Sequence, residues 1–293
     1  MSAIAVRPLS ERTVSSRRRV GDRVVTVFVW LSVAAAIVPL GLVLVHVTGR
    51  GVGVLGREFF TGSIPTTRSR STGMAPAIVG TLLITGAATA ISVPLGVMAA
   101  VYVSEYGTRR RMAGALRFLA DVMAGVPSII TGLFVYTIWV LRFGQSALAG
   151  ALALSCLMLP LVIRASDTAF SLVPRELREA SYALGAGTAR TAVQVVLPAA
   201  LPGVVSGSLL AIARAAGETA PLLFTIGTTQ TLNTNLFGGT NTALSTQIFG
   251  NAQQPFPGAQ ARAWGAALTL VLVVVALSAA ARFLSARLIS ARR

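Results

Sequence analysis

Two residues of opposite charge stand four positions apart in the apolar segment AIARAAGETAPLLFTIG, residues 211–227. They are Arg214 and Glu218, and Thr219 follows directly. An ionisable side chain at the middle of a membrane costs about 2.5–3.5 kcal/mol on insertion scales, so such groups usually face a cavity or a partner. The spacing predicts that the two side chains share one helix face and pair, turned toward the interior of a helix bundle.

The charged pair has two interpretations that the residues alone leave open. One is a structural ion pair that fixes helix packing, and the other is a substrate station in a permeation path. A guanidinium group stays charged at any working pH, and its planar donor fork matches phosphate or carboxylate oxygens. Thr219 would add a hydroxyl group to such a station.

A polar segment, residues 167–200, carries the signals of a short helix. Pro174 suits a first helical turn, Glu176 suits the positive N-terminus, and Gly185 suits the C-terminal cap. We therefore expect a helix over about 174–184 with an apolar stripe, formed by Leu177, Ala180, Ala183 and Leu184. Such a stripe either docks on another protein or lies along this protein's own membrane surface.

These segments belong to a chain with the composition of an integral membrane protein. Of its 293 residues 54% are hydrophobic and 12% are charged, and the mean hydropathy is +0.74. Soluble domains carry about a quarter charged residues. Successive apolar stretches reach the ~20 residues that a membrane helix needs, without the alternation of a membrane barrel. The fold class is therefore expected to be an all-α membrane protein.

We expect six transmembrane helices, at about 24–47, 76–104, 118–141, 146–166, 201–227 and 263–286. Cytoplasmic loops of membrane proteins retain an excess of basic residues. With the N-terminus inside, eighteen arginines fall on the cytoplasmic side and six outside, so both the N- and C-termini are expected to be cytoplasmic.

The spans divide the chain into segments with different surroundings. We expect a basic cytoplasmic tail at 1–23, the first helix, an external loop at 48–75, a membrane domain at 76–286 that contains a coupling loop at 167–200, and a cytoplasmic tail at 287–293. The external loop and the polar segment 228–261 either meet an external partner or are solvated connections.

Several kinds of chemistry are excluded by residue usage. The sequence has no lysine, which both a GxxxxGK[ST] phosphate-binding loop and a Schiff-base enzyme require, so the chain is not expected to hydrolyse ATP. The net charge of +16 does not indicate nucleic-acid binding, because the arginines flank apolar segments. Cys156 and His46 are single, so neither an internal disulfide nor a Cys/His zinc site is expected.

Seven residues of the polar segment resemble the EAA loop of ABC importer permeases. That loop has the form EAA, three residues, G, nine residues, I, one residue, LP. The matching residues here are Glu179, Ala180, Ser181, Gly185, Val195, Leu197 and Pro198, with conservative changes at Ser181 and Val195. In that family the loop sits in a cleft of a separate ATP-binding subunit. The resemblance thus implies coupling residues, which are Glu179, Ala180, Gly185, Leu197 and Pro198.

Four further strings resemble the PstA branch of phosphate importer permeases. They are GTLLIT at 80–85, PLGVMAAVYVSEYG at 94–107, GVPSIITGLF at 125–134 and RAAGETAPLLF at 214–224. The similarity runs from about residue 74 to the C-terminus. It implies the type I ABC importer permease fold, a pore subunit for inorganic phosphate in a bacterial plasma membrane, and roles for Arg214 and Glu218 in phosphate movement.

The same resemblance implies the partners of the chain. These are a homologous permease of the PstC kind, two ATP-binding subunits of the PstB kind that bind ATP and Mg, an external phosphate-binding protein of the PstS kind, and membrane lipid. The chain itself is expected to bind no cofactor, metal or nucleic acid and to be no enzyme. The alternatives are a permease for sulfate or molybdate, since an arginine does not choose among tetrahedral oxyanions, and a membrane subunit that reports phosphate supply to a signalling partner.

Overall fold

The computed structural model describes residues 16–66, 68–107 and 111–290. It consists of two units, residues 1–49 and 50–293, and each is described by itself. Most of the predicted basic tail at 1–23 lies outside the described residues, as do Arg109, Arg110 and the end of the C-terminal tail.

The described part of the first unit lies in one long helix. α1 (Ser16–Gly51) has 36 residues and passes Pro39 without interruption. At about 1.5 Å per residue it is longer than the ~30 Å hydrocarbon core of a bilayer. This helix therefore has the length for the predicted first span.

The second unit is helical, and the described residues of the chain contain no strand. Its long helices are α3 (Ala75–Val101), α4 (Arg111–Gly125), α7 (Ala147–Ser171), α10 (Leu197–Ala216) and α13 (Pro257–Ser290). Its short helices are α2 (Arg57–Thr61), α5 (Ser128–Val135), α6 (Leu141–Phe143), α8 (Arg175–Ala183), α9 (Thr188–Thr191), α11 (Ala220–Thr225) and α12 (Leu244–Ala252). A 3-10 turn, η2 (Val52–Val54), and three π-helical segments complete it: η3 (Tyr102–Tyr106), η5 (Tyr136–Val140) and η6 (Ala192–Val196).

Among the described residues, five helices are long and apolar enough to cross a membrane. They are Gly21–Val54, Ala75–Tyr106, Ala147–Ser171, Thr188–Ala216 and Pro257–Arg287. The helices Arg111–Gly125 and Ser128–Phe143 pass the same test together but are bent by 102°, and as one broken span they bring the number to six. The expected all-α, multi-pass class is confirmed, and the predicted third span is a sharply bent pair.

α7 is the central helix of the second unit, where it packs against α3, α4 and α10. Small residues let these backbones approach, as they commonly do in membrane bundles. A Cβ at Gly96 of α3 would lie 2.7 Å from Val162 of α7, and one at Gly207 of α10 would overlap Ala165. A side chain at either glycine would therefore displace its neighbour on α7, and both α3 and α10 pack closely against α7.

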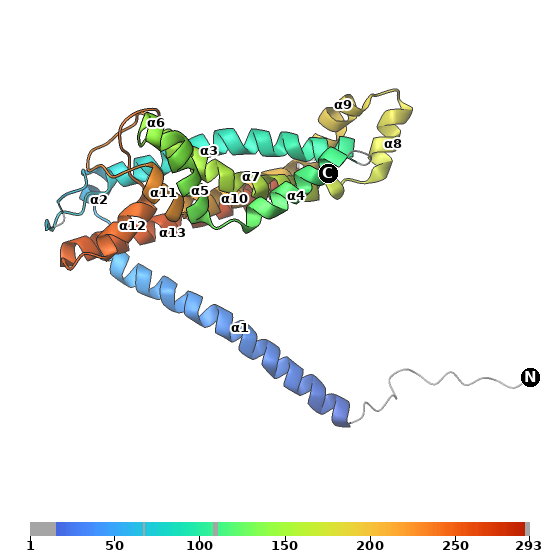
Figure 1. The fold of residues 1–293 in the computed structure, drawn as a ribbon. Helices are drawn as coiled ribbons and strands as arrows, with labels where there is room; N and C mark the ends of the chain where they lie inside the picture. Colours follow the sequence, from blue (N-terminus) through green and yellow to red (C-terminus); the bar gives the residue numbers. More distant parts are fainter. Residues whose placement is uncertain (1–15, 67, 108–110, 291–293) are drawn as a thin grey trace, which may run out of the picture. The chain divides into compact units, whose positions relative to one another are not determined.

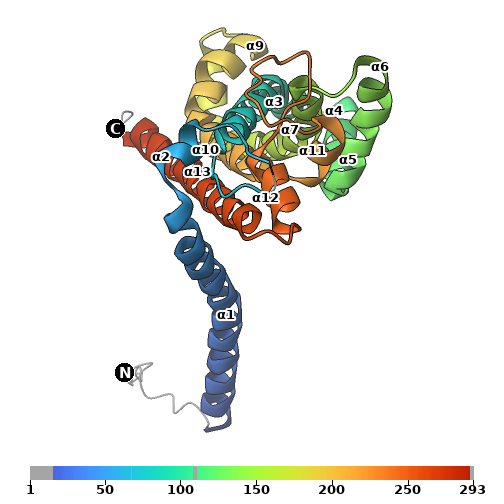
Figure 2. The same ribbon diagram turned by 90° about the vertical axis from the view of Figure 1, so that its left-hand side faces the viewer.

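The two ends of the second unit carry different elements. α8 and α9 lie at one end, and α2 and α12 lie at the opposite end (Figure 1). The turned view shows α13 and α5 on opposite sides of the bundle (Figure 2). We call these the α8 end and the α12 end.

Two interruptions of helical structure shape the interior. Pro127 has φ −58° and ψ 135°, outside the helical region, and it separates α4 from α5. Residues 217–219 separate α10 from α11, so the predicted bounds of the fifth span, 201–227, are wrong: the apolar helical segment runs from Thr188 to Ala216. Pro94 and Pro160, by contrast, lie inside continuous helices.

Candidate functional site

A cavity of about 210 Å³ lies where the α4–α5 bend, α7 and the end of α10 meet. Its wall consists of Met123, Ala124, Val126, Pro127 and Ser128 at the bend, Leu157, Met158 and Leu161 on α7, and Ala211, Arg214, Ala215 and Glu218 at the end of α10. Both charged residues singled out in the sequence therefore border one cavity. Their side chains are its charged groups, in a wall that is otherwise mostly apolar.

Arg214 occupies the last turn of α10, and its side chain is exposed. A cation near the C-terminal carbonyl groups of a helix is stabilised by the helix dipole. Glu218 lies beyond the helix end and is half-buried. Its backbone N–H donates to the carbonyl of Ala215 (3.1 Å), and the hydroxyl of Ser245 on α12 donates to its carbonyl (2.9 Å). These bonds fix the backbone from which the carboxylate projects.

The predicted pairing of Arg214 with Glu218 on one helix face is wrong. The helix ends at Ala216, and a turn at Gly217 follows, so the regular i, i+4 geometry is lost. Three ion pairs occur among the described residues, and none of them joins Arg214 to Glu218. The two groups line the same cavity without neutralising each other.

Thr219 is not among the residues that line the cavity. It is the N-terminal cap residue of α11, where its carbonyl accepts from the N–H groups of Leu222 (3.1 Å) and Leu223 (3.2 Å). Its part in the substrate pathway stays a prediction.

Ser128 is a polar residue of the cavity that the sequence reasoning did not single out. It is the first residue of α5, directly after the bend at Pro127. The first N–H groups of a helix lack partners within the helix, and this end of the dipole favours anions. A serine that follows a proline inside an apolar run is the sequence signal that could have indicated it.

Close packing holds the bend against the segment that follows Glu218. A Cβ at Gly132 of α5 would lie 2.5 Å from the Cα of Pro221 in α11. The absence of a side chain at Gly132 thus permits backbone contact between α5 and α11. The contact joins the helix that follows the bend at Pro127 to the helix that follows Glu218.

A second surface lies on α8 at the α8 end of the unit. The structure has this helix from Arg175 to Ala183, where the sequence predicts one over 174–184. Gly185 has φ +82°, a left-handed conformation that glycine adopts without strain. The N–H of Gly185 donates to Tyr182 (2.9 Å) and that of Ala186 to Ser181 (3.1 Å), which is the Schellman arrangement for ending a helix.

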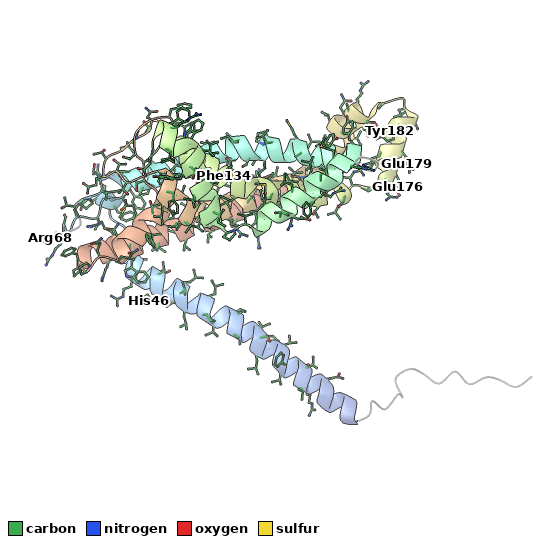
Figure 3. The ribbon with its side chains drawn as sticks, viewed as in Figure 1. His46, Arg68, Phe134, Glu176, Glu179 and Tyr182 are labelled. Atoms are coloured by element: carbon green, nitrogen blue, oxygen red, sulfur yellow. The ribbon has the colours of Figure 1, made fainter. Side chains whose placement is uncertain are left out.

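The surface of α8 is open on the side that bears the EAA-like residues. Figure 3 shows Glu176, Glu179 and Tyr182 along this helix. Glu179 and Ala180 are exposed, and so are the apolar side chains of Leu177 (44%) and Leu184 (89%). The apolar stripe of α8 is thus uncovered by the described parts of this chain.

Leu197 and Pro198 do not join that exposed surface. They begin α10 and are half-buried, and Leu197 packs against an apolar cluster beneath α8. The buried members of this cluster are Ala100, Ala169, Phe170, Val173, Val196, Ala200 and Val204. The EAA-like residues therefore divide into an exposed set on α8 and a packed set at the start of α10.

Comparisons with known proteins show the family of the chain. The family model described as binding-protein-dependent transport system inner membrane component matches residues 92–290. A phosphate transport system permease protein PstA 1 of Mycobacterium tuberculosis is 43% identical, covering 98% of this chain and 94% of the relative. PstA proteins of Mycobacterium leprae (40%; 98% and 95% covered) and Yersinia pestis (38%; 95% and 94% covered) are also similar.

Solved structures show the same fold at low sequence identity. The inward facing MetNI methionine ABC transporter matches with a TM-score of 0.55 at 21% identity, covering 71% of this chain and 91% of that chain. An amino acid ABC transporter with histidines gives a TM-score of 0.53 at 18% identity, covering 72% of this chain and 92% of that chain. The chain belongs to the family of binding-protein-dependent transport system inner membrane components, within its PstA branch.

Proposed function

We propose that the chain is a transmembrane pore subunit of an ATP-driven importer of inorganic phosphate in a bacterial plasma membrane. The relatives that resemble it over nearly their whole length are phosphate transport system permeases. The observation that carries the proposal is the placement of Arg214 in the wall of a cavity bounded by a sharply bent pair of helices and by the end of α10. Broken helices that line an interior cavity are typical of transporter substrate sites.

Arg214 is the residue that binds phosphate in this proposal. Its guanidinium group is charged at every working pH, and its fork can donate two parallel hydrogen bonds to phosphate oxygens. It has no ion-pair partner among the described residues, so its charge is available to a ligand. The hydroxyl of Ser128 and the N-terminus of α5 add donors to the wall of the same cavity.

Glu218 distinguishes phosphate from oxyanions that carry no proton. Phosphate near neutral pH has at least one hydroxyl group that can donate to a carboxylate, whereas sulfate has none. A carboxylate at the cavity wall accepts from the first and repels the second. This is the physical reason for preferring phosphate over sulfate or molybdate.

The exposed stripe of α8 docks on a separate ATP-binding subunit, which holds ATP and Mg. Support comes from the apolar side chains of Leu177 and Leu184 that no described part of the chain covers, and from the EAA-like spacing. The absence of lysine is consistent with an ATPase site that lies on the partner. Glu179, Ala180 and Gly185 belong to this docking surface.

A second permease of the PstC kind completes the pathway. The apolar side chains of α5 next to the cavity are half-exposed or more, namely Ile129, Ile130, Leu133 and Phe134. Figure 3 labels Phe134 within the outline of the bundle. In this arrangement the α8 end is cytoplasmic, as are both termini. The α12 end is external, where a phosphate-binding protein of the PstS kind delivers the substrate.

The test is ATP-dependent uptake of radiolabelled phosphate by proteoliposomes that contain the complete complex, with excess sulfate or molybdate as competitor. We expect uptake that neither competitor reduces, and that Arg214→Gln abolishes without loss of assembly. The control is Arg142→Gln, which alters an exposed arginine on α6 outside the cavity. Uptake that sulfate suppresses, or that Arg214→Gln retains, would refute the phosphate station.

A further inference from the structure

Arg178 of α8 makes the densest set of polar contacts at the α8 end. Its guanidinium Nη2 lies 3.0 Å from Oε1 of Glu105, and its Nε lies 3.2 and 3.3 Å from the two oxygens of the same carboxylate. Its Nη1 donates to the carbonyl of Val173 (2.7 Å), and Nη2 donates to that of Phe170 (2.9 Å). The Arg178 side chain is 18% exposed and that of Glu105 is 3% exposed.

These contacts join three separate elements. Arg178 belongs to α8, Phe170 lies in the last turn of α7, and Glu105 lies in η3, the π-helical continuation of α3. A cation at the last carbonyl groups of a helix is stabilised both by hydrogen bonds and by the dipole. One side chain thus fastens α8 to the ends of two membrane helices.

The other ion pairs of the described residues differ in place and exposure. Arg117 with Asp167 and Arg164 with Asp121 both connect α4 to α7, and in each pair the arginine side chain is 50% exposed. Neither pair includes α8. Exposed pairs are weak and screened by solvent, whereas a buried pair is strongly sensitive to the loss of one partner.

α8 has few other attachments. No residue of this helix is buried, and among the described residues the other side-chain hydrogen bond from it is the contact of the Ser181 and Thr191 hydroxyls (2.9 Å) toward α9. α7, in turn, runs unbroken from the Arg178 contact at Phe170 back to Leu157 and Leu161 in the cavity wall. A displacement of α8 can therefore be transmitted along the continuous helix α7 to the cavity wall.

We propose that Arg178 and Glu105 form a joint that transmits the movement of α8 to α7 and α3, and so to the cavity that contains Arg214. The proposal rests on the proposed function for the docking of α8. Arg178 is a positioning residue in this role, because it acts through α7 and touches no substrate. In this proposal the joint stays closed during the transport cycle, held by its five hydrogen bonds, although both residues border a cavity of about 770 Å³ at the α8 end.

The first test compares Arg178→Gln with Arg117→Gln, which removes a more exposed pair that does not include α8. In the complete complex, we expect Arg178→Gln to keep the ATP-binding subunit bound and hydrolysing ATP while phosphate uptake per ATP falls at least tenfold. Arg117→Gln should change this ratio less than twofold. Loss of uptake and ATP hydrolysis in equal proportion, or failure of Arg178→Gln to assemble, would reduce Arg178 to a structural residue and overturn the proposal.

The second test restores the joint by a covalent bond. Cys156 is the one cysteine of the chain, so a Cys156→Ala background accepts the pair Glu105→Cys and Arg178→Cys. The double cysteine variant should lose phosphate uptake per ATP, and a short bifunctional thiol cross-linker should restore at least half of that loss. Coupling that stays lost after complete cross-linking would contradict a joint that remains closed.

A readout without substrate separates this proposal from the phosphate assignment. Ala124 borders the cavity, and its replacement by cysteine reports cavity opening through the rate of labelling by a water-soluble maleimide. A non-hydrolysable ATP analogue should change that rate in the wild-type joint and leave it unchanged in Arg178→Gln. If phosphate is the wrong substrate, the wild-type and Arg178→Gln complexes still differ in their labelling response to the ATP analogue. If the joint is wrong, the analogue changes the labelling rate equally in both complexes.

Discussion

The cavity and the α8 end both contain arginine and glutamate, but they use these residues in opposite ways. At the cavity, Arg214 is exposed and Glu218 does not pair with it. At the α8 end, Arg178 and Glu105 are mostly buried and bonded to each other. An unpaired charge is available to a ligand, whereas a paired and buried one fixes geometry. This difference supports the two proposed roles, which are substrate binding at the cavity and transmission of movement at the α8 end.

A large loss of phosphate uptake is expected from Gly132→Ala, because Gly132 lets α5 contact α11. Gly132→Ala places a Cβ 2.5 Å from the Pro221 Cα, and such overpacking costs about 1–3 kcal/mol. We expect phosphate uptake to fall about 30-fold and the melting temperature of the complex to drop. Gly86→Ala is the control, because nothing lies within 4 Å of its Cβ. Normal uptake in Gly132→Ala would show that the α5–α11 contact does not set the cavity.

A smaller loss is expected from Arg214→Lys, which keeps the charge and removes the planar fork. An ammonium group cannot make the bidentate contact, so a loss of about 1.4 kcal/mol corresponds to tenfold weaker uptake at limiting phosphate. Initial uptake rates over a range of phosphate concentrations measure this. Equal rates for lysine and arginine would mean that charge alone is read at the cavity.

Glu218→Gln tests whether the carboxylate of Glu218 selects phosphate over sulfate. The neutral amide no longer repels sulfate, so we expect excess sulfate to inhibit phosphate uptake about fivefold more strongly than in the wild-type complex. Competition curves with sulfate check this, and an unchanged sulfate sensitivity would remove Glu218 from the selection of the anion.

The smallest expected effect concerns the end of α8. Gly185→Ala forces a left-handed backbone on alanine, at a cost of about 1–2 kcal/mol, whereas Gly187→Ala is a matched control at φ −77°. Both positions have open space around the Cβ. We expect phosphate uptake per ATP to fall about threefold in the first variant and to be unchanged in the second. Equal values would show that the Schellman ending does not position α8.

The α8 region could be predicted from the sequence because its rules are local. Pro174, Glu176 and Gly185 mark a short helix by their own conformational and electrostatic preferences, and the structure has that helix from Arg175 to Ala183. The bond from Arg178 to Glu105 could not be predicted in the same way. It joins residues 73 apart, and only the packing of α3 against α7 brings them together.

The charged residues of the cavity could be predicted from the sequence, but the end of the helix that carries them could not. An apolar run with Arg214 and Glu218 predicts a functional span, but hydropathy does not show where the helix stops. Pro94 lies in a continuous helix, and Pro127 ends one. The presence of a proline therefore does not by itself predict where a helix ends. The wrong pairing of Arg214 with Glu218 follows directly from assuming an unbroken helix.

The most direct test of the two proposed roles is the rate at which maleimide labels Ala124→Cys. It is measured in complete complexes that carry Cys156→Ala, with and without a non-hydrolysable ATP analogue. The account predicts that Arg214→Gln keeps the nucleotide-dependent change in labelling while phosphate uptake is lost, and that Arg178→Gln loses this change. A complex in which Arg214→Gln abolishes the change, or in which Arg178→Gln retains it in full, would contradict the account.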